Sequence, residues 1–288
     1  MSDPATRLHT LLGVPVVAVT DLGHSHAWTL RRARLADGRD IFVKALDPHR
    51  QPDAGRALAA EAASLRWLGE GDTDGLIPEV LAADPDTLVL PWLPETAPAP
   101  PAAERFGREL AALHSRTPDA YGAPWPGFIA ALPQDNSQST GEWGSWYAEH
   151  RLAPMLRAAA PTLGEEGVHT IERVIFTIDN FAGPSEPPSR IHGDLWSGNI
   201  RWTPDGARLI DPAAHGGHRE TDLAMLALFG APHLDRILAA YQESAPLEAG
   251  WRQRVPLHQL YPLLVHVALF GGAYRAGTLD AARAILAG

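Results

Sequence analysis

A proline-rich segment divides the chain into two parts of different character. Residues 91–101 read PWLPETAPAPP and contain five prolines. Proline lacks a backbone N–H and fixes φ, so such a segment cannot continue a strand and delays the start of a helix. We therefore predict an N-terminal part over residues 1–91, a hinge or linker over residues 92–101, and a C-terminal part over residues 102–288.

The two parts differ in the secondary structure that their residue patterns predict. Before the linker we expect one alanine-rich helix over residues 54–71 and strands over residues 16–20, 27–35, 40–46, 78–84 and 86–93. After it we expect mainly helices, over residues 102–116, 142–160, 165–182, 220–229, 232–243 and 255–272. The pattern predicts an α+β, bilobal fold, with a small β-rich N-terminal lobe, a larger mainly helical C-terminal lobe and a ligand cleft between them.

Charge and composition exclude several classes of protein. The net charge is −10, from 34 acidic against 24 basic residues, so we expect no nucleic-acid partner and no binding to an anionic membrane. The longest apolar stretch, residues 261–274, is too short to span a bilayer, and Asp3 and Pro15 argue against a signal peptide. The absence of cysteine excludes disulfides and thiolate chemistry and fits a cytoplasmic protein. Nothing in the sequence specifies an oligomeric state.

Two charged residues of the N-terminal part stand among apolar neighbours. Lys44 lies in IFVKAL, where strand alternation puts it on the same face as Phe42. Glu61 lies on the apolar stripe of the helix over residues 54–71, three residues after Leu58. A buried carboxylate is costly unless it is paired, so Lys44 is its predicted partner. Each residue alone has an ordinary alternative, an edge-strand lysine or a glutamate that reaches water.

A loop in the C-terminal part concentrates polar side chains between apolar flanks. Residues 190–200 read RIHGDLWSGNI, with Asp194 and Asn199 five positions apart. Asp211 follows Asn199 by twelve residues, at the end of the apolar run in RLIDPA. A tight structural loop is one interpretation of the segment. The other interpretation is the layout of a protein-kinase-like phosphotransferase. That layout has, in this order, a strand lysine with a helix glutamate, a hinge, an Asp-x4-Asn loop and a further Asp.

Phosphotransfer chemistry gives each of these residues a predicted role. Lys44, fixed by Glu61, would hold the non-transferred phosphates of ATP. Asn199 and Asp211 would bind Mg²⁺, because this ion prefers hard oxygen ligands. Asp194 would accept the proton of the substrate hydroxyl and orient it for in-line attack.

The segment between the first two predicted strands stands where a glycine-rich phosphate loop would lie. It reads DLGHSHAW and contains a single glycine. We expect Gly23 and the hydroxyl of Ser25 to lie near the phosphates, although as a motif the segment carries little weight.

With these residues in place, the sequence resembles the fructosamine (ketosamine) kinase family, a branch of the protein-kinase-like fold near aminoglycoside and choline kinases. HGDLWSGNI is similar to the catalytic loop of that family, and LIDPAAHGGHRETDLAMLALFG to its metal-binding Asp and following helix. LPQDNSQSTGEWGSWYAEHRLAPML and QLYPLLVHVALFGGAY also resemble family segments. Together with FVKAL and the Glu61 helix, the resemblance runs over nearly the whole chain.

The resemblance implies an activity and places further residues. It implies a kinase that phosphorylates the third-carbon hydroxyl of the sugar in ketosamines, which are fructosamine or ribulosamine adducts of free or protein-bound amines. The product breaks down and frees the amine, so the reaction would be protein deglycation. The residues that would meet adenine at the hinge are Leu90, Trp92 and Leu93, and Asp222 would brace the catalytic loop. Some relatives carry a redox-sensitive cysteine in the phosphate loop, and this chain has none.

Several aromatic residues and histidines have secondary predictions. Trp196 distinguishes the catalytic loop from those of related phosphotransferases and therefore favours a ketosamine as the substrate. Trp143 and His218 are also expected near the substrate. His192 is expected to hold the catalytic loop through hydrogen bonds. A hydrolytic metal centre at His215 and His218 is disfavoured against solvent-facing or helix-capping positions.

Two other functions stay open from the sequence. A small-molecule kinase for an aminoglycoside, choline or another hydroxylated amine would share all the ATP-binding residues and differ only in the substrate region. A catalytically inactive nucleotide-binding protein is the second alternative. The joint presence of Lys44, Glu61, Asp194, Asn199 and Asp211 argues against it, since such proteins usually lose one of these residues.

Overall fold

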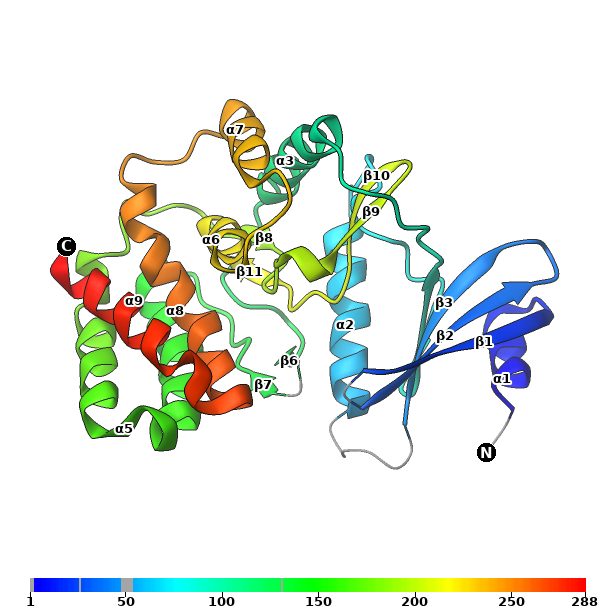
Figure 1. The fold of residues 1–288 in the computed structure, drawn as a ribbon, viewed down its shortest axis with the longest axis horizontal. Helices are drawn as coiled ribbons and strands as arrows, with labels where there is room; N and C mark the ends of the chain where they lie inside the picture. Colours follow the sequence, from blue (N-terminus) through cyan, green and yellow to red (C-terminus); the bar gives the residue numbers. More distant parts are fainter. Residues whose placement is uncertain (1–2, 26, 48–53, 131) are drawn as a thin grey trace.

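A computed structural model describes residues 3–25, 27–47, 54–130 and 132–288. An antiparallel sheet and two helices form the N-terminal region, and the C-terminal region is mainly helical (Figure 1). The α+β architecture expected from the sequence, with a small β-rich N-terminal region and a larger mainly helical C-terminal region, is confirmed. The proposed division into domains over residues 1–91, 92–101 and 102–288 stays a prediction.

The N-terminal region is built on one five-stranded sheet of order β1-β2-β3-β5-β4. All neighbouring strands pair antiparallel. The strands are β1 (Val16–Ser25), β2 (Trp28–Leu35), β3 (Asp40–Leu46), β4 (Ala82–Asp84) and β5 (Thr87–Pro91). The bounds of β3 agree with the predicted strand, since its run of alternating apolar residues ends between turn residues on one side and a polar segment on the other.

A helix covers each face of the sheet. Helix α1 (Pro4–Leu12) was not predicted, and its Leu8 packs in one core cluster with Ile41 and Val43 of β3. Helix α2 (Ala54–Gly69) covers the opposite face, where Phe42 packs against a second core cluster. Alternate side chains of β3 therefore pack into different core clusters, as the alternation of side chains along a strand requires.

The C-terminal region is mainly helical and contains the polar loop over residues 190–200, which is called the catalytic loop below after the family segment that it resembles. Helix α3 packs on α7, and α8 packs on α5, α6 and α9. The helices are α3 (Pro100–His114), α4 (Trp143–Tyr147), the π-helical turn η1 (Ala148–Leu152), α5 (Ala153–Phe176), α6 (Glu220–Phe229), α7 (Leu234–Ser244), α8 (Trp251–Phe270) and α9 (Arg275–Ala287), with short 3-10 turns η2 (Ile178–Asn180), η3 (Ser197–Asn199) and η4 (Gly271–Tyr274). None of the described helices is both long enough and apolar enough to cross a membrane.

The gap predicted between the helices over residues 142–160 and 165–182 is absent, because helix α5 spans it. The structure continues α5 across the gap between them, with a kink at Gly164, whose φ of 74° and ψ of 170° are not helical. Glycine tolerates this backbone conformation because it has no Cβ. The helix ends at Phe176, six residues earlier than predicted.

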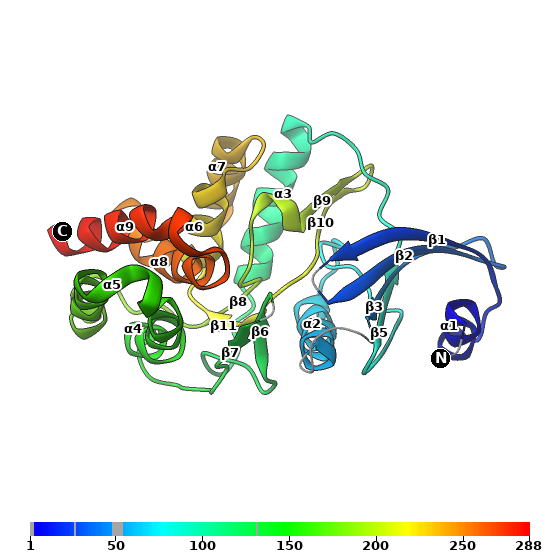
Figure 2. The same ribbon diagram turned by 60° about the horizontal axis from the view of Figure 1, so that its bottom comes forward.

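Three two-stranded ladders interrupt the helices, and two of them frame the polar loop over residues 190–200. Strand β8 precedes the loop and pairs with β11, and β9 follows it and pairs with β10. A third ladder, β6 with β7, lies beside helix α2 (Figure 2). The strands are β6 (Gly127–Ile129), β7 (Leu132–Gln134), β8 (Ser189–Ile191), β9 (Ile200–Thr203), β10 (Gly206–Leu209) and β11 (His215–Gly217).

The proline-rich segment joins the sheet to the helices. Strand β5 ends at Pro91, and helix α3 starts at Pro100, two residues before the predicted start. Proline is well tolerated in the first turn of a helix, because the N–H groups there have no intrahelical partner. One core cluster then continues from α2 and β5 to α3 and the catalytic loop, so the two regions share buried side chains.

Candidate functional site

An ion pair inside the cleft wall joins strand β3 to helix α2. Lys44 Nζ lies 2.6 Å from Glu61 Oε2, and both side chains are at most one-tenth exposed. The same ammonium group lies 2.9 Å from Asp211 Oδ1, which follows strand β10 in the C-terminal region. The indole ring of Trp28 lies under Nζ, 4.5 Å from its centroid. The predicted Lys44–Glu61 contact is present, and Asp211 makes it a group of three charges.

Burial and mutual attraction set the charges of this group. Burial alone would lower the pKa of Lys44, but the carboxylates of Glu61 and Asp211 outweigh it and raise that pKa above its ordinary value. Loss of solvent beside the surrounding protein favours the neutral form of Asp211, but the Lys44 ammonium outweighs this effect and lowers the pKa of Asp211. Lys44 is thus a fixed cation, and Asp211 a carboxylate that faces the cleft with its side chain 48% exposed.

Asp222 holds the backbone of the catalytic loop. The buried carboxylate, in the first turn of helix α6, accepts hydrogen bonds from the N–H groups of His192 (2.7 Å) and Gly193 (2.9 Å). His114 of helix α3 contacts the same carboxylate at 3.1 Å. Gly193 has a φ of +80°, and a Cβ there would lie 2.3 Å from the carbonyl oxygen of Ala213. The loop is therefore fixed where it turns.

His192 connects the catalytic loop to the segment that carries Asp211. Its Nε2 lies 2.9 Å from the carbonyl oxygen of Ile210, and its Nδ1 lies 3.3 Å from the N–H of Asp194. These contacts fit one neutral tautomer, in which Nε2–H donates and Nδ1 accepts. Burial lowers the pKa of His192, which also favours the neutral ring. The side chain lies where it can hold the loop by hydrogen bonds.

Asp194 and Asn199 face each other across the catalytic loop. Asn199 Nδ2 donates to the backbone oxygen of Asp194 at 2.8 Å and to its Oδ2 at 3.1 Å. Burial raises the pKa of Asp194 to about 7, although the hydrogen bond from Asn199 opposes the shift. Because Nδ2 is used by Asp194, the amide oxygen of Asn199 is turned away from it.

The residues that could hold a metal ion are Asn199 and Asp211. They offer an amide oxygen and a carboxylate, both hard donors of the kind that Mg²⁺ and Ca²⁺ prefer. The orientation of the Asn199 amide, fixed by its two hydrogen bonds to Asp194, leaves the oxygen as its available ligand atom. The donor set therefore fits a divalent cation.

Two adjoining cavities meet at this group. The larger, of about 420 Å³, is lined by the predicted hinge residues Leu90, Trp92 and Leu93 together with Leu30, Phe42 and Ile210. The smaller, of about 230 Å³, is lined by Asp194, Trp196, Asn199 and Glu61. Ser25, Lys44 and Asp211 line both cavities. An apolar chamber thus opens beside a polar one, with a lysine and a carboxylate at their junction.

Of the two residues expected near the phosphates, Ser25 lines the cavities and Gly23 does not. Gly23 and Ser25 both belong to strand β1, which is longer than predicted. Ser25 lies at the junction of the two cavities. Gly23, with a φ of +96°, stands at a register shift and donates its N–H to Asp21 Oδ1 at 2.7 Å. It is not among the residues that line the cavities.

Trp196 is the aromatic residue of the catalytic loop that reaches the polar cavity. Its side chain is 41% exposed and lies edge-on to Phe229, with ring centroids 6.5 Å apart. The indole also lies against Gly198, where a Cβ would come within 2.3 Å of the ring. The absence of a side chain at position 198 therefore allows the ring its place beside the cavity.

Trp143 and His218 are brought together but not to either cavity. Both are buried, and neither is among the cavity-lining residues. Trp143 stacks on His258 of helix α8 at 4.6 Å and lies 4.9 Å from His218. Of the two alternatives expected for His215 and His218, the solvent-facing one is wrong, since both are buried. His218 instead caps helix α6, because its Nδ1 accepts the N–H of Glu220, the first residue of that helix.

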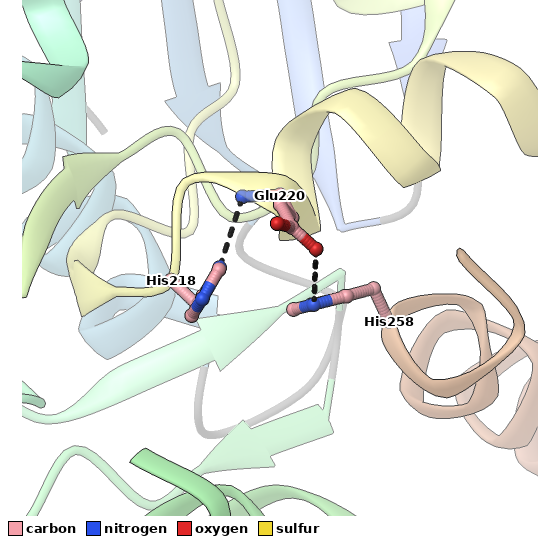
Figure 3. Close-up of side chains that lie close together, drawn as sticks. All are labelled: His218, Glu220 and His258. Carbon is pink, nitrogen blue, oxygen red and sulfur yellow. Dashed lines mark hydrogen bonds and ion pairs between the residues drawn. The ribbon is translucent and has the colours of Figure 1, made fainter. Parts of the chain in front are cut away.

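His218, Glu220 and His258 form the one group of metal-binding type found among the described residues (Figure 3). His218 Nδ1 accepts the N–H of Glu220 at 3.2 Å, and His258 Nε2 lies 3.3 Å from Glu220 Oε2. Arg254 donates to both carboxylate oxygens of Glu220, at 2.9 and 2.5 Å. A guanidinium that already neutralises the carboxylate disfavours a second cation there. The group therefore ties the start of helix α6 to helix α8.

The structure adds two polar residues to the smaller cavity that the sequence did not single out, Ser64 of helix α2 and Asn136. Asn136, after strand β7, lines the smaller cavity together with Gly127, Phe128 and Ile129 of strand β6. Two signals in the sequence cover Asn136. The polar stretch DNSQST predicts a loop without indicating which side chain turns inward, and LPQDNSQSTGEWGSWYAEHRLAPML resembles a family segment.

The sheet, the Lys44–Glu61–Asp211 group and the braced loop around Asp194 define a protein-kinase-like phosphotransferase. A sequence profile of the fructosamine kinase family matches residues 20–287, and the chain belongs to that family. It is 34% identical over 261 residues to the probable ketoamine kinase of Klebsiella aerogenes, covering 88% of this chain and 86% of that protein. The protein is thus an ATP-dependent phosphotransferase that acts on a hydroxyl group of a sugar-amine substrate.

Solved structures agree with this assignment. A crystal structure from Thermobifida fusca, of a protein assigned as a fructosamine-3-kinase, is 51% identical, with a TM-score of 0.95 over 99% of both chains. A macrolide 2'-phosphotransferase from Brachybacterium faecium, 15% identical, has a TM-score of 0.61 over 96% of this chain and 95% of its own. At that identity the likeness concerns the fold alone.

Proposed function

We propose that this protein phosphorylates the third-carbon hydroxyl of the sugar in ketosamines, with ATP as the phosphate donor and Mg²⁺ as the cation. The observation that carries the proposal is the junction of the two cavities. Lys44 and Asp211 stand where an apolar chamber meets the chamber of Asp194 and Trp196. A nucleotide in the first and a sugar in the second would bring the γ-phosphate to the fixed charges between them.

In this proposal the larger cavity holds the nucleotide. Leu90, Trp92 and Leu93 would enclose adenine, since they line the apolar part of that cavity. Lys44, held by Glu61, would bind the non-transferred phosphates, and Ser25 lies where its hydroxyl can reach them. Asn199 and Asp211 would hold the cation, which neutralises the charge on the phosphates.

The smaller cavity would bind and orient the sugar. Asp194 would accept the hydrogen of the reacting hydroxyl, because it is the carboxylate of the catalytic loop that lines this cavity. The hydrogen bond that it accepts from Asn199, and those that Asp222 accepts from the loop backbone, fix its position. Trp196 would contact the sugar or the adjacent amine with its exposed ring. Phosphorylated ketosamines would then release the amine, which makes deglycation in the cytoplasm the proposed role.

ATP consumption with four acceptors tests the proposal. We expect turnover with fructosyl-lysine and ribulosyl-lysine, and none above background with kanamycin or choline. Identification of the phosphorylated carbon by nuclear magnetic resonance, followed by detection of free lysine, tests the position and the release. The Asp194→Asn variant is the control for contaminating kinases. Turnover of an aminoglycoside but of neither ketosamine would show that the proposal is wrong.

A further inference from the structure

Asn136 is a buried amide at the wall of the smaller cavity. It follows strand β7, is 6% exposed and lines the same chamber as Asp194 and Trp196. Gly127 of strand β6 lies against it, so close that a Cβ at position 127 would be 2.7–2.8 Å from the amide atoms. Gly127 also lines the cavity, so a side chain at position 127 would displace the amide at the cavity wall.

Arg151 sets which way this amide faces. Its guanidinium, in the π-helical turn η1, donates from Nη2 to Asn136 Oδ1 at 2.8 Å. Arginine has only donors, so the oxygen of the amide must face Arg151 and Nδ2 must face away from it. Arg151 is itself fully enclosed: it also donates to the carbonyl oxygen of Asp135 and lies over the ring of Trp146, 4.4 Å from its centroid. The orientation of the amide is therefore fixed from outside the cavity.

The Nδ2 group that results has no hydrogen-bond partner among the residues that the structure describes. A buried amide N–H without a partner is rare in native proteins, and each instance calls for a physical reason. Here Asn136, the residue that carries the group, lines the same chamber as Asp194. A ligand with an acceptor atom in this chamber supplies the missing partner.

We propose that Asn136 Nδ2 donates a hydrogen bond to an oxygen of the sugar part of the substrate, a carbonyl or a hydroxyl that does not react. The proposal rests on the proposed function, because it takes the smaller cavity as the sugar site. Asp194 accepts from the sugar and Asn136 donates to it, so a polyhydroxylated ketosugar is held at two points and a single hydroxyl turns towards Asp194. An acceptor such as choline, with one oxygen, offers only one of the two contacts. Arg151 is a positioning residue, since it acts through the amide.

The Asn136→Asp variant removes the donor and keeps an acceptor for Arg151. A carboxylate at position 136 still accepts from Arg151, so the guanidinium keeps its partner. We expect the KM for the ketosamine to rise about tenfold or more, because a site that has lost one directed hydrogen bond to a sugar binds it more weakly. We expect the KM for ATP to stay within about twofold. Gln138→Glu makes the same amide-to-acid change on an exposed side chain two residues later, and we expect both KM values to stay at those of the wild type.

A second variant and a set of substrate analogues test the proposal even if Asn136→Asp does not fold. Gly127→Ala would push a methyl group into the amide, and we expect the same rise in the ketosamine KM with an unchanged ATP KM. Ketosamines that each lack one sugar oxygen identify the contact. One of these analogues should bind the wild-type protein more weakly than the complete ketosamine does. The Asn136→Asp variant should bind this analogue and the complete ketosamine equally well. This is the logic of a double-mutant cycle.

The outcomes separate the two proposals. A wild-type protein that turns over no ketosamine would contradict the proposed function itself. If the wild-type protein is active and folded Asn136→Asp keeps its ketosamine KM, the role of Asn136 is wrong. Should Asn136→Asp fail to fold, the substrate series decides with the wild-type protein alone. Equal KM values for every non-reacting deoxy analogue would then overturn the assignment.

Discussion

Lys44 Nζ lies 2.6 Å from Glu61 Oε2 and 2.9 Å from Asp211 Oδ1, and so contacts acids from both regions of the chain. The first contact joins strand β3 to helix α2 within the N-terminal region, and the second reaches a residue 167 positions later. Breaking one partner of a buried ion pair leaves an uncompensated charge, which is costly. The position of Lys44 therefore depends on both acids at once.

Substitutions at Lys44 and Glu61 should be strongly non-additive. We expect Lys44→Met to lower kcat/KM for ATP by about 100-fold, and Glu61→Gln by about tenfold, because Asp211 still holds the ammonium in the latter. The double variant should be no worse than Lys44→Met alone, since Glu61 acts through Lys44. Steady-state kinetics measure all three. Losses that multiply in the double variant would show that Glu61 has a separate role.

Removal of the Asp194 carboxylate should affect turnover and not nucleotide binding. We expect Asp194→Asn to lower kcat on the order of 10²–10⁴-fold, the range typical of a lost general base. Binding of Mg·ATP, measured by calorimetry, should be largely unchanged, because Asp194 lies in the smaller cavity and not among the residues that line the larger one. Near-normal activity in this variant would exclude Asp194 as the base.

The ring of Trp196 should matter for the sugar-amine substrate alone. We expect Trp196→Ala to raise the KM for a ketosamine about tenfold, the scale of one aromatic contact, and Trp196→Phe to restore part of the loss. The KM for ATP should not change. Phe176→Ala is the matched control, since Phe176 is an exposed aromatic residue at the end of helix α5, outside both cavities. An unchanged ketosamine KM in Trp196→Ala would remove this residue from the substrate site.

Buried histidines should make the protein less stable in mild acid. Burial, helped by the nearby Arg151 guanidinium, lowers the pKa of His215 well below its ordinary value, against the opposing influence of Asp222. The folded protein therefore keeps His215 neutral at pH values where the unfolded chain binds a proton. The stability that the neutral ring contributes is fully present above about pH 6.5 and is lost as the pH falls below it, at up to about 1.4 kcal/mol per pH unit.

Chemical denaturation between pH 7.5 and 5 measures this effect. We expect His215, His218 and His258, whose pKa values burial lowers, to reduce the free energy of unfolding below pH 6.5. The raised pKa values of Asp194 and Glu61 act in the opposite direction, so the contribution of His215 is read from the difference between two proteins. His215→Gln should lose less stability than the wild-type protein over the same pH interval, since its amide can still donate to the carbonyl oxygen of Ala213 without titrating. Equal losses in the two proteins would contradict the prediction.

Much of the architecture follows from local sequence patterns. The alternation in DIFVKAL is sufficient to place β3 and its two faces, and the helix over residues 220–229 has the bounds of α6. The pairing of Lys44 with Glu61 was also predictable, because each is a charge on an otherwise apolar surface that needs a partner. Helix α1 was missed because it is short and its packing on the sheet, through Leu8, is what stabilises it.

The sequence by itself determined the order of a strand lysine, a helix glutamate, a loop with Asp194 and Asn199, and a later Asp211, because the type and spacing of these residues are local properties of the chain. Only the tertiary structure decided which polar side chains face the cavity. It placed Trp143 and His218 in a buried group and Asn136 at the wall of the smaller cavity. The orientation of Asn136 depends on Arg151, fifteen residues later in another element. Such a contact is specified by packing in three dimensions and leaves no periodic signal in the sequence.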